Sequence, residues 1–202
     1  ALWTYYPSYV TIKCTGTGYT YLGGYGTTGK VTSPAISVDA HNGLIVSLKI
    51  AYIDSWDAET FTITADGTTV YSKTFTGTGQ AGTNTCGSTT WGDSYATTTF
   101  GFNHTASTVK FVFTSTLNQA ASDEAWGICD LTITASLYPV NEDGSEITTE
   151  YVTSTSTTWF SCSKMSADYL WTYSPSYTSI KCSGTGYTYL GGYGSGGKVT
   201  SP

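Results

Sequence analysis

A long internal repeat constrains the fold of this chain more than any other feature. Residues 2–34 recur as residues 170–202, an offset of 168, and 27 of the 33 positions are identical. Chance does not produce such a match, and self-similarity at a fixed period is typical of proteins built from successive structural units. The repeat therefore predicts a 168-residue unit followed by the first part of the next, rather than two copies of a short motif within one domain.

The composition indicates an all-β unit. Charged residues make up only 11% of the chain and aromatic residues 15%, and Thr, Ser, Gly and Tyr fill most other positions. These residues favour strands and turns over helices. Short alternating segments separated by turns predict an antiparallel β-sandwich of jelly-roll type, repeated in tandem with the 168-residue period.

Particular segments carry this interpretation. Residues 44–53 and 61–75 read as strands, and Asp66-Gly67 marks a hairpin turn within the second segment. Residues 95–102 and 108–115 read as a further strand pair, and together these strands predict an antiparallel meander. We expect the sandwich to cover residues 1–138, a Thr/Ser-rich linker residues 139–168, and the start of the next repeat, equivalent to 1–34, residues 169–202.

Charge and hydropathy exclude two classes of partner. The net charge is −6, and all eight basic residues are Lys, so the chain lacks the basic face and the Arg side chains that nucleic-acid binding uses. No run of about 18 apolar residues occurs, so this window predicts no membrane span.

The opening Ala-Leu-Trp, without Met or a signal-peptide pattern, suggests a processed chain or a piece of a longer one.

Five cysteines are consistent with disulfides once the repeat is considered. Cys182 is Cys14 one unit later, so each full unit carries four cysteines and two bridges. Two pairings fit the residues: Cys14–Cys86 with Cys129–Cys162, or Cys86–Cys129 with Cys162–Cys182. No CxxC pair occurs, which disfavours a zinc site.

The triplet Asn103-His104-Thr105 matches the N-glycosylation pattern and falls at an expected strand turn. Together with the cysteines, it predicts an extracellular or cell-surface glycoprotein.

Two acidic clusters beside tryptophans stand out, 54–59 and 123–127. If they converge, their carboxylates supply the hard oxygen ligands that Ca²⁺ prefers. The candidate ligands are Asp54, Asp57, Glu59, Asp123 and Glu124. In the alternative interpretation, Asp54 and Glu124 cap backbone N–H groups at a sheet corner while Trp56 and Trp126 pack in the core.

The sequence predicts no enzyme. Paired carboxylates suggest a glycosidase, but these lie in short motifs at expected strand ends rather than in a large cleft. His41 and His104 lack a recognisable nucleophile beside them. Tyr19, Tyr21 and Tyr25 are candidates for stacking against a glycan, although packing between units is the alternative use of these rings.

Several of these motifs together resemble a jelly-roll, galactose-binding-like module of tandem-repeat, cysteine-containing surface proteins of ciliates and related protists. The resemblance covers residues 12–135 and rests most specifically on Asp54-Ser55-Trp56-Asp57 followed by Asp123-Glu124-Ala125-Trp126-Gly127. Further matching residues are Cys14, Leu22-Gly23-Gly24-Tyr25, His41, Asp66-Gly67, Cys86-Gly87, Trp91-Gly92-Asp93 and His104. The resemblance implies a Cys14–Cys86 bridge, leaves Cys129 to pair with Cys162, and implies a surface protein without catalytic activity.

From these observations we expect an extracellular structural protein, a filament, stalk or surface coat, in which units contact neighbouring copies head to tail. The segment 1–34 is the candidate junction, because an extended strand can complete a neighbouring sheet edge. The alternative is a carbohydrate-binding adhesin, with or without Ca²⁺.

Overall fold

The computed structural model describes residues 2–75, 82–87 and 90–147 in full. Beyond them it describes the backbone of five short strands, 155–158, 172–174, 179–181, 188–190 and 198–200. The chain divides into two units, residues 1–165 and 166–202. No helix among the described residues is long and apolar enough to cross a membrane.

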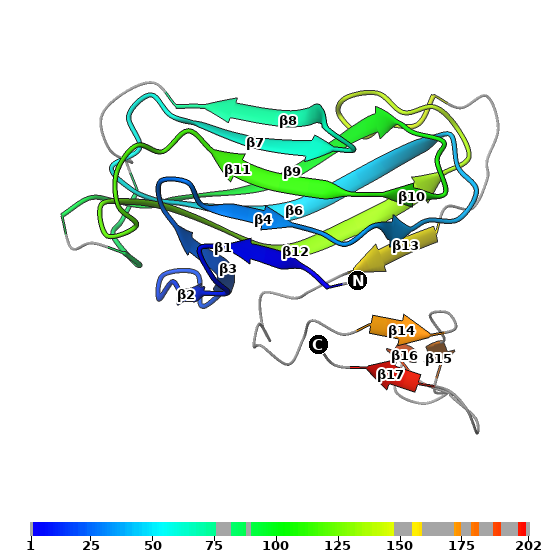
Figure 1. Cartoon of the computed structure of the whole chain (residues 1–202), viewed down its shortest axis with the longest axis horizontal. Coiled ribbons are helices and arrows are strands. Elements are labelled where there is room, and N and C mark those ends of the chain that lie inside the picture. Colours follow the sequence, from blue (N-terminus) through cyan, green and yellow to red (C-terminus); the bar gives the residue numbers. More distant parts are fainter. Residues whose placement is uncertain are drawn as a thin grey trace. The chain divides into compact units, whose positions relative to one another are not determined.

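The first unit is a sandwich of two antiparallel sheets (Figure 1). The strand order of the first sheet is β1 (Thr4–Tyr6), β4 (Lys30–Thr32), β11 (Phe111–Ser115), β7 (Thr60–Ala65) and β8 (Thr68–Thr74). The order of the second is β2 (Thr11–Lys13), β3 (Thr20–Tyr25), β12 (Glu124–Ser136), β6 (Gly43–Asp54) and β9 (Ser94–Asn103). A short pair, β5 (Ile36–Ser37) with β10 (Thr108–Val109), lies beside them.

This arrangement confirms the predicted antiparallel sandwich but corrects the predicted connections. β7 and β8 form the expected hairpin, and Asp66 and Gly67 at its tip have φ angles of 49° and 86°, as a two-residue hairpin turn requires. The meander is wrong, because β6 pairs with β12 and β9 while β7 belongs to the other sheet. The strand pair predicted from residues 95–102 and 108–115 is also wrong, since the chain crosses between sheets there and β11 pairs with β4 and β7. The alternation of apolar and polar residues identifies a strand, but it does not indicate which other strand it pairs with.

Alternating side chains on the facing strands form the core. On β6, Leu44, Val46, Leu48 and Ile50 point inward and are at most 1% exposed. Trp56 and Trp126 are also fully buried, as the core-packing interpretation of the acidic clusters predicted.

A bulge in β12 changes which face its side chains occupy. The register with β6 shifts between Cys129 and Thr132, and Asp130 has a φ of 53°. The inward residues are therefore Trp126 and Ile128 before the bulge but Leu131 and Ile133 after it. Asp130 forms an ion pair with Lys49 of the adjacent strand at 2.7 Å.

The segment expected to be a linker contributes a strand to this sheet. β13 (Thr155–Thr158) pairs with the second half of β12, with Thr132 opposite Thr158. Val140 is buried and forms a bridge with Glu146, so residues 139–147 also pack against the sandwich. The rest of the expected linker lies outside the described residues.

The second unit repeats strand pairings of the first. β14 (Thr172–Ser174) pairs with β17 (Lys198–Thr200), and Thr172 lies opposite Thr200 as Thr4 lies opposite Thr32. β15 (Ser179–Lys181) pairs with β16 (Thr188–Leu190) in the register that joins β2 to β3. The repeated sequence thus forms the same local pairings in both copies.

Candidate functional site

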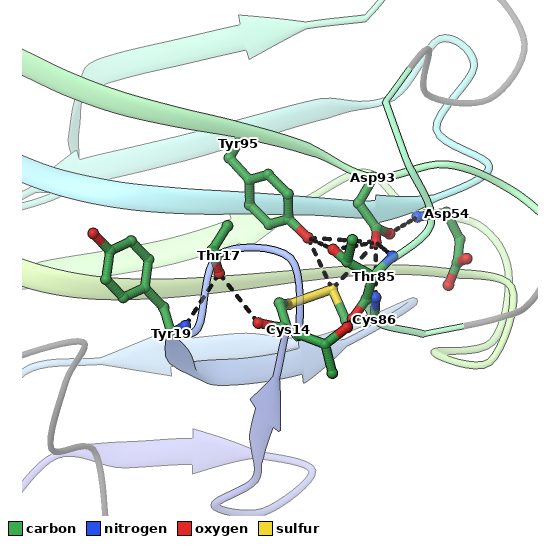
Figure 2. Close-up of a disulfide and its surroundings, with 9 residues drawn as sticks. Cys14, Thr17, Tyr19, Asp54, Thr85, Cys86, Asp93 and Tyr95 are labelled. Carbon is green, nitrogen blue, oxygen red and sulfur yellow. Dashed lines mark hydrogen bonds between the residues drawn. A yellow bond between two sulfur atoms is a disulfide. The ribbon is translucent and has the colours of Figure 1, made fainter.

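A disulfide joins Cys14 to Cys86 on the outer face of the second sheet (Figure 2). This is the pairing that the resemblance implied, and it excludes the alternative Cys86–Cys129 bridge. Cys129 is disulfide-bonded as well, but its partner lies outside the described residues, as do Cys162 and Cys182. All three described cysteines belong to a small buried cluster with Tyr21, Ala51, Ile53 and Ala125.

Asp93 organises the loop that carries Cys86. Its Oδ2 accepts hydrogen bonds from the backbone N–H groups of Thr85, at 2.7 Å, and Cys86, at 2.8 Å, and its Oδ1 accepts one from the N–H of Asp54 at 3.2 Å. Figure 2 shows this carboxylate between the disulfide and Asp54. Asp93 matched the resembled module, but its role could not be predicted from the sequence, because it depends on how the chain returns to Cys14 after 72 residues.

The acidic clusters meet where β6 ends and β12 begins. Asp54 lies opposite Glu124 in the sheet, and the loop after Asp54 is pinned across β12. The Trp56 indole N–H donates to the carbonyl oxygen of Ala125 at 2.8 Å, and the Ser55 hydroxyl donates to the carbonyl oxygen of Asp123 at 2.8 Å. These bonds fix the loop that leads into β7.

Three of the five predicted metal ligands come together at this corner. Asp57, Glu59 and Glu124 each offer a carboxylate oxygen, and these oxygens lie within 4.8 Å of one another. Asp54 and Asp123 are outside this group. The backbone N–H of Asp54 bonds Asp93, and the carbonyl and Oδ1 of Asp123 accept from the Ser55 hydroxyl.

The three carboxylates have different environments. Burial raises the pKa of Glu124, and the charges of Glu59 and Asp57 raise it further. A hydrogen bond that protonated Asp57 donates to Glu59, together with the charge of Glu59, raises the pKa of Asp57. Burial acts in the same direction on Glu59, but the N–H groups of Asp57 and Ala58, at 2.8 and 3.1 Å, outweigh it and lower the Glu59 pKa. This part of the site holds Glu59 ionised and disfavours a second and third charge beside it.

The residues proposed for glycan stacking do not form a platform. Tyr21 and Tyr25 are each only 1% exposed. Tyr25 packs against Trp126 in the core, and Tyr21 stacks on Tyr95 over the outer sheet face. Tyr19 is half-buried and lies under the Lys49 ammonium group. The expectation fails because a register shift between Gly23 and Tyr25 turns Tyr25 into the core, while Tyr21 stays in the packed cluster on the outer face.

A groove of about 720 Å³ opens instead between β8 and β9, at edges of the two sheets. Aromatic and polar side chains line it, chiefly Tyr71, Phe100, Phe102, Asp66, His104 and Glu142. Phe100 is buried and stacks with Tyr71 at a centroid separation of 5.3 Å. The sequence did not reveal this groove, because residues about thirty positions apart meet only when the two sheets pack.

His104 connects the groove to a buried histidine. His41 Nε2 lies 2.7 Å from His104 Nδ1, and the two rings stack with centroids 5.0 Å apart. The other His104 nitrogen lies 3.0 Å from the Asp66 carboxylate, and His41 Nδ1 lies 2.5 Å from the carbonyl oxygen of Asp39. These three contacts, from Asp66 through His104 and His41 to Asp39, connect the hairpin tip to the loop before β6.

Asn103 is exposed at the end of β9 and also lines the groove. Its Oδ1 accepts a hydrogen bond from the backbone N–H of Val140 at 3.1 Å. Nδ2, the atom that N-glycosylation modifies, has no part in this bond. Glycosylation of Asn103 stays a prediction.

No family model and no curated protein matches the chain, so the ciliate resemblance also stays a prediction. Among solved structures, similarity extends to the C-terminal CBM6 of LamC, a marine laminarinase from Zobellia galactanivorans. The identity is 12%, over 63% of this chain and 95% of that chain, with a TM-score of 0.36. CBM35 from Paenibacillus barcinonensis is 17% identical over 66% of this chain and 93% of that chain, with a TM-score of 0.32. At these scores the similarity carries no inference about function.

Proposed function

We propose that the sandwich is an extracellular carbohydrate-binding module, and that the groove between β8 and β9 holds the sugar. The groove's combination of aromatic rings with convergent polar groups is the observation that supports this proposal. Sugars present apolar C–H faces that pack on aromatic rings and hydroxyls that need fixed hydrogen-bond partners. Most of the lining residues lie on β7, β8, β9 and the hairpin turn between β7 and β8, so their backbone positions are set before a ligand arrives. In this proposal the module binds the sugar without catalysing a reaction on it.

The charge of the groove favours a neutral glycan. Its described lining includes the carboxylates Asp66 and Glu142 but no Lys or Arg. A sulfated or uronic-acid chain would therefore meet like charge without a compensating cation. The Cys14–Cys86 disulfide supports an oxidising, extracellular location for the module.

The test is a neutral-oligosaccharide array followed by calorimetry with the strongest binder. We expect Tyr71→Ala and Glu142→Ala each to weaken binding, Tyr71→Ala by about tenfold for the lost packing surface. Tyr6→Ala is the matched control, because Tyr6 is 58% exposed and outside the groove. The proposal fails if no neutral glycan binds, or if Tyr71→Ala binds as tightly as the unaltered chain.

A second function is supported by a separate observation. The identical strand registers in residues 4–32 and 172–200 suggest that residues 170–202 begin another sandwich. We infer a tandem array, in which successive sandwiches make a filament, stalk or surface coat and present several grooves along it. Electron microscopy of the full-length protein should show strings of equal globules, and separate single globules would contradict the array.

A further inference from the structure

The corner between β6, β7 and β12 brings three carboxylates together, and none of the ion pairs among the described residues supplies a positive charge there. Glu59 and Glu124 are 5% and 0% exposed, and Asp57 lies against both. Bringing three carboxylates within 4.8 Å of one another, two of them away from water, is strongly unfavourable unless a positive charge joins them. The ion pairs among the described residues are Lys49–Asp130 and His104–Asp66, and neither reaches this corner.

Glu124 gives a second, independent indication. Its Oε2 is buried and has no hydrogen-bond partner. The Gln119 side-chain amide donates to its Oε1 at 3.4 Å, and the backbone groups of Asn118 and Gln119 also act on this carboxylate. A buried carboxylate oxygen without a partner is rare in folded proteins, and a missing ion is one of its regular explanations. Glu59, in contrast, is well bonded by Asp57, Ala58 and Asn118, so its position is fixed before any ion binds.

We propose that Asp57, Glu59 and Glu124 form a calcium-binding site. All three donors are carboxylate oxygens, which suit Ca²⁺ and disfavour the metals that select Cys or His. Asp57 is exposed, so the remaining coordination positions are open to water. Calcium accepts such an irregular mixture, whereas Mg²⁺ demands a near-ideal octahedron.

The ion has a structural role here. It joins the loop that carries the chain from β6 in one sheet to β7 in the other with the first residue of β12. Glu59 precedes β7 and Asp66 follows it, so the site and the groove lie about 20 Å apart along that strand. Calcium therefore raises the stability of the sandwich without contacting a sugar in the groove, and the two proposals can fail separately.

Two measurements on the intact chain test the site. In the first, thermal unfolding is followed with CaCl₂, with MgCl₂ and with a chelator. We expect Ca²⁺ to raise Tm in a concentration-dependent way, because an ion that binds only the folded state stabilises it by mass action. In the second, Tb³⁺ replaces Ca²⁺, and Trp56, next to Asp57 in the chain, sensitises its luminescence.

Glu124→Gln and Glu59→Gln should each weaken Ca²⁺ binding by at least about tenfold. Mutating a residue that only hydrogen-bonds to a metal ligand commonly lowers the metal affinity by that factor, and these two residues are themselves ligands in the proposed site. Glu146→Gln, elsewhere on the sandwich, is the charge-matched control and should bind normally. Folding of each variant is checked by circular dichroism, and Glu124→Gln is expected to fold because it removes a charge from a crowded site.

The competing arrangement is a proton shared among the three carboxylates. In that case Ca²⁺ changes neither Tm nor Tb³⁺ luminescence, and the proposal is overturned. Equal effects of Ca²⁺ and Mg²⁺ would also overturn it, as would Tb³⁺ binding that survives in Glu124→Gln.

Discussion

The backbone N–H of Cys86 donates a hydrogen bond to Asp93 Oδ2 at 2.8 Å, so one carboxylate holds one end of the Cys14–Cys86 disulfide in place. The same side chain also accepts from Thr85 and Asp54 and is only 1% exposed. It thereby connects the cysteine loop to the end of β6.

Asp93→Asn should lower the free energy of unfolding by about 3 kcal/mol, because an amide cannot accept three N–H bonds as the ionised carboxylate does. Urea unfolding measures the loss, and exposed Asp39→Asn is the control. The disulfide of the variant should also react faster with a thiol reductant. Unchanged stability and an unchanged reduction rate would contradict the role given to Asp93.

The second copy of the repeat suggests a stabilising substitution in the first. Thr28 has a φ of 62°, a left-handed conformation that is unfavourable for a β-branched residue. The equivalent position, 168 residues later, is Gly196. Thr28→Gly should raise the free energy of unfolding by about 1 kcal/mol, since relief of strain exceeds the added freedom of the unfolded chain.

Thr27→Ser is a control drawn from the same comparison, because Ser195 is the equivalent of Thr27 and Thr27 is not among the residues with positive φ. We expect that change to leave the thermal midpoint within error. A loss of stability in Thr28→Gly would mean that the Thr28 side chain contributes more than its backbone strain costs.

The β-sandwich and part of the acidic site were predictable from the sequence. Alternation in residues 44–53 and the Asp66-Gly67 turn identified strands and a hairpin, because both signals are local. Pairing between sheets was not predictable, and neither was the bulge at Asp130 that reverses the faces of β12. Both depend on contacts between residues far apart in the chain. The groove between β8 and β9 could not be predicted for the same reason. Of the five acidic residues, the sequence could not tell which three would meet, since side-chain direction at a strand end depends on the loop that follows.

Burial makes several tyrosines resist ionisation. Burial, partly offset by a hydrogen bond from Thr85, raises the pKa of Tyr95 to about 12, and burial also raises the pKa values of Tyr5, Tyr21, Tyr25 and Tyr52. In the unfolded chain these phenols lose their protons near pH 10. The unfolded state therefore releases protons that the native state keeps, and stability falls as the pH rises above 10.

A spectrophotometric titration should accordingly show two classes among the 17 tyrosines. One class ionises reversibly while the protein stays folded, and the buried class ionises in one steep step that coincides with unfolding by circular dichroism. A single smooth titration of all tyrosines in the folded protein would contradict the packing described for β3 and β6.

The partner of Cys129 is open to a direct chemical test. Cys129 is disulfide-bonded, and Thr132, three residues later, lies opposite Thr158 of β13. Cys162 follows Thr158 by four residues, so the antiparallel course of β13 favours the predicted Cys129–Cys162 bridge. Non-reducing peptide mapping by mass spectrometry should recover these two cysteines in one linked peptide. Recovery of Cys129 with Cys182 would instead join the sandwich to the repeated segment.

The rings of His41 and His104 connect the hairpin tip to the loop before β6. His41 Nδ1 faces the carbonyl oxygen of Asp39, His41 Nε2 faces His104 Nδ1, and His104 Nε2 faces the Asp66 carboxylate. The two rings also stack, with centroids 5.0 Å apart. Hydrogen bonds and ring stacking therefore act together at this contact, and a substitution that keeps an aromatic ring but removes the nitrogens separates them.

His104→Phe preserves the edge contact with Phe102 and the stack against His41 but removes both hydrogen bonds of His104. It leaves His41, which is 7% exposed, with an unpaired nitrogen, so we expect a loss of about 1–3 kcal/mol in urea unfolding. Asp66→Asn should cost less, because Asp66 is largely exposed and an amide oxygen still accepts from His104. An unaltered stability of His104→Phe would show that ring stacking, and not these hydrogen bonds, holds the hairpin tip against the loop before β6.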